Sequence, residues 1–154
     1  RPLVVHAPTN RLVKGTRFIE KAVESLRSKG VDFDFILVEK MTNAEAKAIY
    51  EKADLIVDQL MAGWYGVFAL ELMMMGKPVI AYIRPEDLAQ EPESFQTELP
   101  IIRASPESIE DVLEKALQNH IALPTIGSRS RAFAKKWYDA DKIAANVLAD
   151  YNTL

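Results

Sequence analysis

The stretch ADLIVDQLMAGWYGVFALELMMMGKPVIAYI, residues 53–83, contains the pattern that decides the fold. Residues 54–57 and 78–83 are short apolar runs bounded by turn formers, which predicts two buried strands. Between them, residues 67–75 are apolar almost all round, which predicts a helix with little exposed surface. Strands too apolar to have a wet face favour a parallel sheet that helices cover on both sides.

The same alternation of strands and helices continues along the rest of the chain. We expect further strands at residues 3–5, 33–38 and 101–102. We expect helices from Thr16 to Gly30, after the capping box that Thr42 forms with Glu45, from Ser105 onward, and at residues 128–137 and 141–151. Residues 6–14 and 84–99 are rich in polar residues and turn formers, which indicates loops. The prediction is a doubly wound parallel sheet, a Rossmann-like α/β fold in one domain, residues 1–154.

The composition is that of an ordinary globular protein. Of the 154 residues, 49% are hydrophobic and 27% charged, and a formal net charge of −3 gives no field that would gather nucleic acid. Cysteine is absent, histidine occurs twice, and no apolar run approaches the roughly 20 residues of a membrane helix. We therefore expect no metal site, no nucleic-acid partner, no transmembrane segment and a cytoplasmic location.

The loop after the first strand is the first candidate site, because open parallel sheets bind ligands beyond the carboxyl ends of their strands. Arg11 and Lys14 directly precede a helix that begins near Gly15. Two cations beside the positive end of a helix dipole favour a phosphate, although solvated loop charges are an equally good interpretation. The pattern is neither GxxxxGK[ST] nor GxGxxG, which disfavours the common ATP and NAD sites.

The turn at residues 63–66 is the second candidate, because it leads into the helix that holds Glu71. Glycines at a helix N-terminus let an anion approach backbone donors, and Glu71 is able to accept hydrogen bonds from sugar hydroxyls. Trp64 and Tyr65 either pack the turn, which is the favoured interpretation, or stack on a ligand, and we interpret the methionines at 73–75 as core filling. Residues 39–41, after the second strand, are a third candidate, where backbone contacts would leave no side-chain pattern.

Three polar residues have more than one interpretation. His6 ends the first strand and is either a satisfied structural histidine or a group that faces the ligand. Asp58 either lines the cleft or ties down its loop, and His120 is predicted to cap a helix C-terminus.

Two segments resemble a known family. Residues 4–26, VVHAPTNRLVKGTRFIEKAVESL, followed by residues 53–83, resemble the C-terminal, donor-binding half of retaining GT-B glycosyltransferases of group 1, also called family 4. The resemblance covers essentially the whole chain. Its most specific part is a small turn, a helix with an acid and the sequence G-x-P-V-I-A in succession. It implies that the chain is one half of a GT-B architecture, without the N-terminal acceptor-binding half.

The resemblance implies roles for residues in the first two candidate sites. Lys14 matches the family lysine that pairs with the donor diphosphate, and Arg11 is a weaker match because its spacing to the lysine is short. Glu71 matches the second acid of an E-x7-E element, whose carboxylate accepts hydrogen bonds from the ribose hydroxyls.

The turn before Glu71 agrees with the family pattern at three positions and departs from it at one. Tyr65, Gly66 and Val67 match a G-F-G-L turn whose backbone faces the phosphates and the donor sugar. The first acid of E-x7-E would fall at Gly63, so its contact with the sugar is missing or is supplied differently.

The function implied by the resemblance is transfer of a glycosyl group, with retention, from a UDP- or GDP-linked sugar to an acceptor on the N-terminal half. A lysine and a helix dipole would neutralise the leaving diphosphate without a metal, and no cofactor beyond the donor is expected. The sequence singles out no catalytic residue, and the isolated domain is expected to be inactive. The full enzyme would be cytoplasmic or peripheral to the membrane.

The two ends of the chain support the interpretation as part of a larger enzyme. The chain begins with Arg1 and enters a strand almost at once, so we expect it to be a piece of a longer protein. The last predicted helix has an apolar stripe that would pack on the other half or, without it, promote self-association. The stripe consists of Ile143, Val147, Leu148 and Tyr151.

Two alternatives come from other functional classes. A nucleotide-sugar epimerase-like GT-B half is disfavoured because such sites usually bring more acidic and histidine chemistry. A non-catalytic, flavodoxin-like interaction module is the other alternative. A receiver-like version of it would need an acidic cluster after the first strand, where this chain has His6, Ala7, Pro8 and Thr9.

Overall fold

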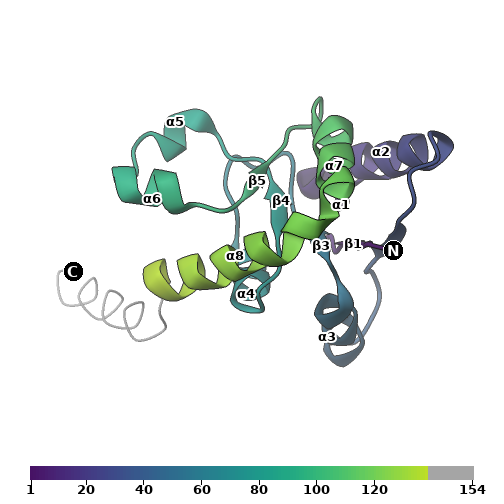
Figure 1. Ribbon diagram of the computed structural model, residues 1–154, viewed down its shortest axis with the longest axis horizontal. Coiled ribbons are helices and arrows are strands. Elements are labelled where there is room, and N and C mark those ends of the chain that lie inside the picture. Colours follow the sequence, from purple (N-terminus) through teal and green to yellow (C-terminus); the bar gives the residue numbers. More distant parts are fainter. Residues whose placement is uncertain (139–154) are drawn as a thin grey trace.

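Five parallel strands form one sheet in the computed structural model, which describes residues 1–138 (Figure 1). The strands are β1 (Leu3–His6), β2 (Asp34–Leu37), β3 (Leu55–Val57), β4 (Val79–Ala81) and β5 (Ile102–Arg103). Their order is β2-β1-β3-β4-β5, and Val5 lies opposite both Ile36 and Ile56. The chain therefore adds β2 on one side of β1 and then crosses over to add β3 on the other side. Such a switch point opens a crevice at the carboxyl ends of the strands.

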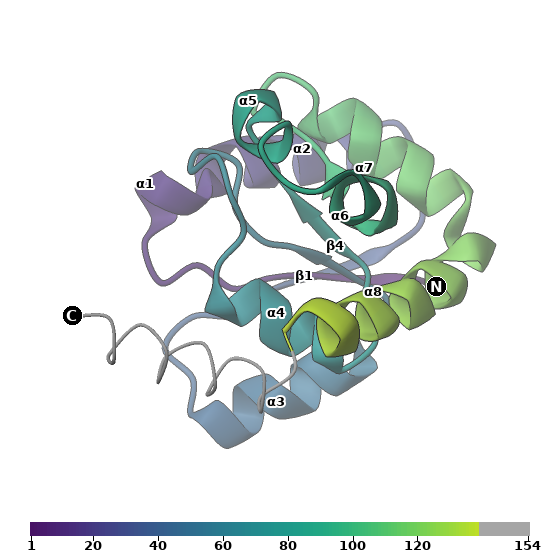
Figure 2. The ribbon, with the colours of Figure 1, turned by 90° about the vertical axis from the view of Figure 1, so that its left-hand side faces the viewer.

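Helices cover both faces of the sheet, as the doubly wound prediction requires (Figure 2). The helices are α1 (Arg11–Lys14), α2 (Thr16–Ser28), α3 (Asn43–Lys52), α4 (Val67–Met74), α5 (Pro85–Leu88), α6 (Glu93–Glu98), α7 (Ile109–Gln118), the 3₁₀ helix η1 (His120–Ala122) and α8 (Leu123–Trp137). One apolar core joins α2 and α7 to the sheet, and the other joins α3, α4 and α8 to it. The carboxyl ends of the strands point toward α1 in Figure 2, which is the edge where the candidate site must lie.

Local signals fix several element ends where the sequence predicts them. Thr42 and Glu45 form both hydrogen bonds of a capping box at the start of α3. Gly30, with φ 85°, follows the end of α2, in the left-handed conformation that glycine adopts without steric cost. These two predictions are confirmed.

Two predicted loops are wrong in part, because they contain short helices. Residues 84–99 form α5 and α6, which bury Leu88, Phe95 and Leu99 while their polar residues face solvent. Residues 6–14 end in α1, where the Asn10 side chain accepts hydrogen bonds from the amides of Leu12 and Val13. A few apolar side chains and one cap are sufficient for such helices when the rest of the fold covers them.

The final described helix begins earlier than predicted and packs closely on the α4–β4 connection. α8 starts at Leu123, with Pro124 in its first turn, rather than at residue 128. A Cβ atom on Gly127 would lie 2.1 Å from the carbonyl oxygen of Gly76, so only glycine fits this contact. Within residues 1–138, no helix combines the length and apolar character that crossing a bilayer needs. The predicted helix at 141–151 and its apolar stripe lie outside the described residues.

Candidate functional site

A cleft of about 750 Å³ lies at the carboxyl edge of the sheet. It is bounded by the loops that follow β1 and β2 and by side chains of α3 and α4. Lys14 and Glu71, which the sequence places in two separate candidate sites, both line it, as do Glu39, Lys40 and Met41 from the third. The fold therefore brings Lys14, Glu71 and residues 39–41 into one cleft, whereas Arg11 and the turn at residues 63–66 do not line it.

Lys14 is held in place by a buried carboxylate. Its Nζ donates to Oδ1 of Asp58 at 2.8 Å, and the lysine side chain is 16% exposed whereas that of Asp58 is fully buried. The same Nζ lies 5.9 Å from the ring centroid of Phe68. An ammonium has three donors, so one bond to Asp58 leaves others for a ligand in the cleft. Asp58 thus has the loop-tying role that was one of its two interpretations.

Arg11 does not line the cleft but forms an ion pair with Glu39, which does. Its guanidinium donates to both carboxylate oxygens of Glu39 at 2.6 Å, and it lies 3.5 Å from Glu20. These hydrogen bonds are the main reason that the pKa of Glu39 is lowered and the pKa of Arg11 is raised. The pair connects α1 to the loop after β2, so Arg11 holds Glu39, which lines the cleft.

Glu71 is exposed and faces the cleft rather than the core of the sheet. Because water and any ligand can solvate its carboxylate, no buried partner is required. Its charge contributes to the raised pKa of the Tyr50 hydroxyl, for which burial is the larger cause. The methionines after it divide between two environments. Met73 is fully buried and Met75 is partly buried against the same core, as predicted, although Met75 also lines the cleft. Met74 is exposed and lines the cleft, so its prediction as core filling is wrong.

The turn at residues 63–66 is fixed by aromatic packing behind it. Trp64 stacks on Phe95 with 6.2 Å between ring centroids and on Tyr65 with 5.1 Å. Tyr65 is buried and its hydroxyl hydrogen-bonds that of Tyr138, and burial is the main cause of its raised pKa. The prediction that Trp64 and Tyr65 pack is confirmed.

The start of α4 offers backbone rather than side chains to a ligand. Gly66 is the N-cap residue, and no side chain among residues 1–138 caps the helix. Val67, the first helical residue, is 73% exposed and does not line the cleft. An uncapped N-terminus leaves amide donors and the positive end of the helix dipole available to an anion.

His6 is a structural residue under the floor of the site. It is fully buried, its Nδ1 donates to the carbonyl oxygen of Val57 at 2.7 Å, and its Nε2 accepts from the Thr16 hydroxyl at 2.9 Å. Burial is the largest cause of its lowered pKa, so the ring is neutral. His120 hydrogen-bonds the carbonyl oxygen of Leu117 at 3.1 Å, as a cap at the end of α7. Among residues 1–138, no three acidic or histidine side chains gather into a group that could hold a metal ion.

Sequence reasoning missed part of the cleft wall. Tyr50 and Phe68 line it and contact each other edge to face, with 5.3 Å between centroids. Phe68 lies three residues before Glu71, a spacing that places both on one face of a helix and could have predicted it. Lys40 also lines the cleft with φ 54°, an uncommon conformation for a residue other than glycine. Nothing in its sequence context indicated that conformation.

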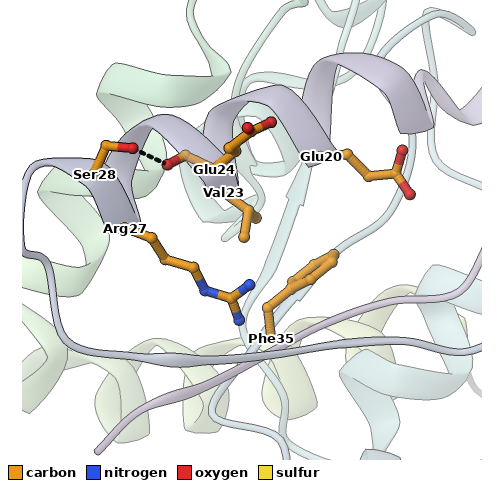
Figure 3. Close-up of a pocket in the computed structure, with 6 residues that line it drawn as sticks. All are labelled: Glu20, Val23, Glu24, Arg27, Ser28 and Phe35. Carbon is orange, nitrogen blue, oxygen red and sulfur yellow. Dashed lines mark hydrogen bonds between the residues drawn. The ribbon is translucent and has the colours of Figure 1, made fainter.

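A second hollow, of about 490 Å³, lies between α2 and the edge strand β2 (Figure 3). Its walls include Glu20, Glu24 and Arg27 from α2 and Phe35 from β2. Neither Lys14 nor Glu71 lines it, and it brings together no set of groups that the sequence singles out. The cleft at the switch point is therefore the candidate functional site.

Solved structures share this fold. HepE of Anabaena in complex with UDP-glucose matches 99% of this chain over 49% of its own, with a TM-score of 0.68 and 15% identity. Sucrose-phosphate synthase from Thermosynechococcus elongatus matches 99% of this chain over 45% of its own, with a TM-score of 0.67 and 17% identity. The catalytic domain of starch synthase IV from Arabidopsis thaliana, bound to ADP and acarbose, matches 88% of this chain over 36% of its own, with a TM-score of 0.61 and 17% identity.

The chain spans at most about half the length of these proteins. No protein-family model matches the sequence, and no curated protein sequence matches it significantly. Fold and coverage agree with the predicted half of a larger architecture. The chain therefore has the fold of the C-terminal domain of a GT-B glycosyltransferase.

Proposed function

We propose that this chain binds a nucleoside-diphosphate sugar as the donor-binding half of a retaining glycosyltransferase. The observation that supports this most directly is the meeting of Lys14 and Glu71 in one cleft with the loop after β2. A cation suits phosphates, and a carboxylate suits the hydroxyls of a ribose. A volume of about 750 Å³ is in the range of small-molecule sites. HepE, which shares the fold, has a crystal structure in complex with UDP-glucose.

The order of the strands suggests how the donor lies. Its base would contact residues 39–41 after β2, which line the cleft and include Lys40 with its uncommon φ of 54°. The ribose would reach Glu71, and the diphosphate would lie between Lys14 and the uncapped start of α4. In this arrangement Gly66, Val67 and the backbone of Tyr65 contribute amides rather than side chains. Arg11 would not contact the donor and would instead hold Glu39 in the wall of the cleft.

The reaction would depend on stabilising a leaving group. When the bond between the anomeric carbon and the diphosphate breaks, negative charge grows on the phosphate oxygens. The Lys14 ammonium and the positive end of the α4 dipole neutralise that charge, which needs no divalent ion. The acceptor would come from an N-terminal half, so this chain alone would bind the donor and transfer nothing.

Calorimetric titration of the chain with UDP and with GDP tests the proposal. We expect one of the two to bind, and Lys14→Ala and Glu71→Ala each to weaken binding about tenfold or more, because each removes a charged hydrogen-bond partner. Lys21→Ala on α2 and Glu107→Ala, two exposed residues that do not line the cleft, are the matched controls and should change nothing. Absence of binding by both nucleotides at millimolar concentration would contradict the proposal.

A further inference from the structure

Gly63 and Arg84 are packed against each other at the ends of β3 and β4. The amide of Arg84 donates to the carbonyl oxygen of Gly63 at 2.8 Å. A Cβ atom on Gly63 would lie 3.0 Å from Cβ of Arg84, 3.1 Å from its Nε and 3.2 Å from its Cζ. These distances are shorter than ordinary van der Waals contacts, and Gly63 does not have a positive φ. Space for the arginine, rather than backbone conformation, therefore explains the glycine.

The resemblance to glycosyltransferases predicts an acid at position 63, directed at the donor sugar. In this chain the direction in which that side chain would leave the backbone is filled by the Arg84 guanidinium. The local charge is thus positive instead of negative. A single substitution to glycine would only delete the acid, whereas the packing found here replaces it with a cation.

The charge of Arg84 is largely uncompensated within the described part of the chain. Its side chain is 54% exposed, and its one ion pair there is with Asp87, at 3.7 Å. That distance is too long for a hydrogen bond, and such exposed pairs contribute little. A guanidinium has five N–H donors, so Arg84 retains a fork that fits a carboxylate.

If the donor lies as proposed above, the strand order puts Arg84, which lies outside the cleft lining, toward the sugar end. The base, ribose and diphosphate are assigned to the ends of β2 and β1 and to α4, and the next strand ends along the edge are those of β3 and β4. The loop after β3 begins beside the diphosphate position, because the Leu60 amide donates to the Lys14 carbonyl oxygen at 3.2 Å, and it leads directly to Gly63. The glycosyl group would therefore lie toward Gly63 and Arg84.

We infer that Arg84 recognises a carboxylate on the donor sugar, so that the donor is a nucleoside-diphosphate uronic acid. The inference rests on the proposed function and names its substrate class. A neutral hexose would leave the guanidinium without a charged partner, while a uronate carboxylate would form two charge-assisted hydrogen bonds with it. Arg84 acts here as a specificity-determining residue and has no part in the bond-breaking step.

Calorimetry with matched ligands tests this inference. The chain is titrated with UDP, UDP-glucose and UDP-glucuronate or, if GDP is the nucleotide that binds, with GDP, GDP-mannose and GDP-mannuronate. We expect the uronate to bind about tenfold or more tightly than the neutral sugar, as for a hydrogen-bonded charge pair. Arg84→Gln should remove that difference and leave the affinity for the free nucleotide unchanged, and Arg84→Lys should retain part of it. Arg129→Gln, at an exposed arginine of α8, is the matched control and should keep all of it.

Two results would overturn the inference while the proposed function stands. One is equal affinity of the original chain for the uronate and the neutral sugar. The other is an equal loss of affinity for the free nucleotide and for both sugars in Arg84→Gln, which would assign Arg84 to the diphosphate. Failure of every nucleotide to bind would instead refute the proposed function, and the inference with it.

Discussion

The Nζ of Lys14 lies 2.8 Å from Oδ1 of Asp58, and the carboxylate has no solvent exposure. The second carboxylate oxygen, Oδ2, has no hydrogen-bond partner within residues 1–138. The lysine is therefore the main compensation for a buried negative charge as well as a candidate ligand for phosphate. Binding and stability depend on the same side chain at this position.

Lys14→Met should destabilise the fold, because it leaves the Asp58 carboxylate buried without a partner. Removing one member of a buried ion pair costs about 3 kcal/mol of unfolding free energy. Urea denaturation at neutral pH measures this cost. The double variant Lys14→Met/Asp58→Asn should recover much of it, because the amide carries no charge. If the single variant is as stable as the original chain, the pair contributes no stability.

His6 should make stability depend on pH. Its pKa is lowered from 6.5 in the folded chain, chiefly by burial, which outweighs the opposing effects of the Val57 carbonyl, Asp58 and Glu39. Below 6.5 the unfolded chain therefore binds a proton that the folded chain does not bind. The stabilisation is complete above that value and is lost as the pH falls toward the lowered folded-state pKa.

Unfolding free energies at about pH 7.5 and about pH 5.5 test this dependence, because most carboxylates remain ionised across that range. The chain should be less stable at the lower pH. His6→Gln, which keeps a hydrogen-bond donor and an acceptor without titrating, should flatten the dependence. His120→Gln, at an exposed histidine, should leave it intact. A pH dependence that survives in His6→Gln would assign the effect to other groups.

Gly127→Ala should cost about 1–3 kcal/mol, as expected when an added methyl group overpacks a contact. The new Cβ would lie 2.1 Å from the Gly76 carbonyl oxygen, and that backbone atom can move only if α8 or the α4–β4 turn moves. Ser128→Ala, at the next and exposed position of α8, should stay within about 0.5 kcal/mol. Thermal or urea unfolding of both variants measures the difference. Equal stabilities would mean that α8 shifts without cost.

Features of the fold that depend on nearby residues were predictable from the sequence. The capping box of α3, the end of α2 at Gly30 and the apolar strands each depend on a few consecutive residues, and all are observed. The rule that parallel strands bind ligands beyond their carboxyl ends selected the loops and the helix that hold Lys14 and Glu71, which the structure brings into one cleft. These inferences needed only short-range pattern and topology.

Features that depend on pairs distant in sequence were not predictable in the same way. α6 forms within a polar segment because Phe95 packs on Trp64, Phe133 and Trp137. The assignment of Arg11 as a direct phosphate ligand did not anticipate its pairing with Glu39, 28 residues away. The sequence likewise identified the unexpected glycine at position 63 but not its neighbour Arg84.

Gly63→Glu should restore the charge that the family pattern has at this position and should abolish the inferred sugar preference. The new carboxylate would arise within reach of the Arg84 guanidinium and would pair with it, because the two side chains leave the backbone toward the same space. Affinity for the uronate donor should fall to about that for the neutral sugar, a loss of about tenfold or more, while affinity for the free nucleotide stays unchanged.

Gly63→Gln is the matched control, because it adds nearly the same volume without a charge. It should keep a preference for the uronate even if the forced shift of Arg84 weakens the binding of both sugar donors. The same calorimetric titrations compare the two variants. A uronate preference that is equally lost in both would mean that volume alone disturbs the site, and one that persists in Gly63→Glu would mean that Arg84 does not face the sugar.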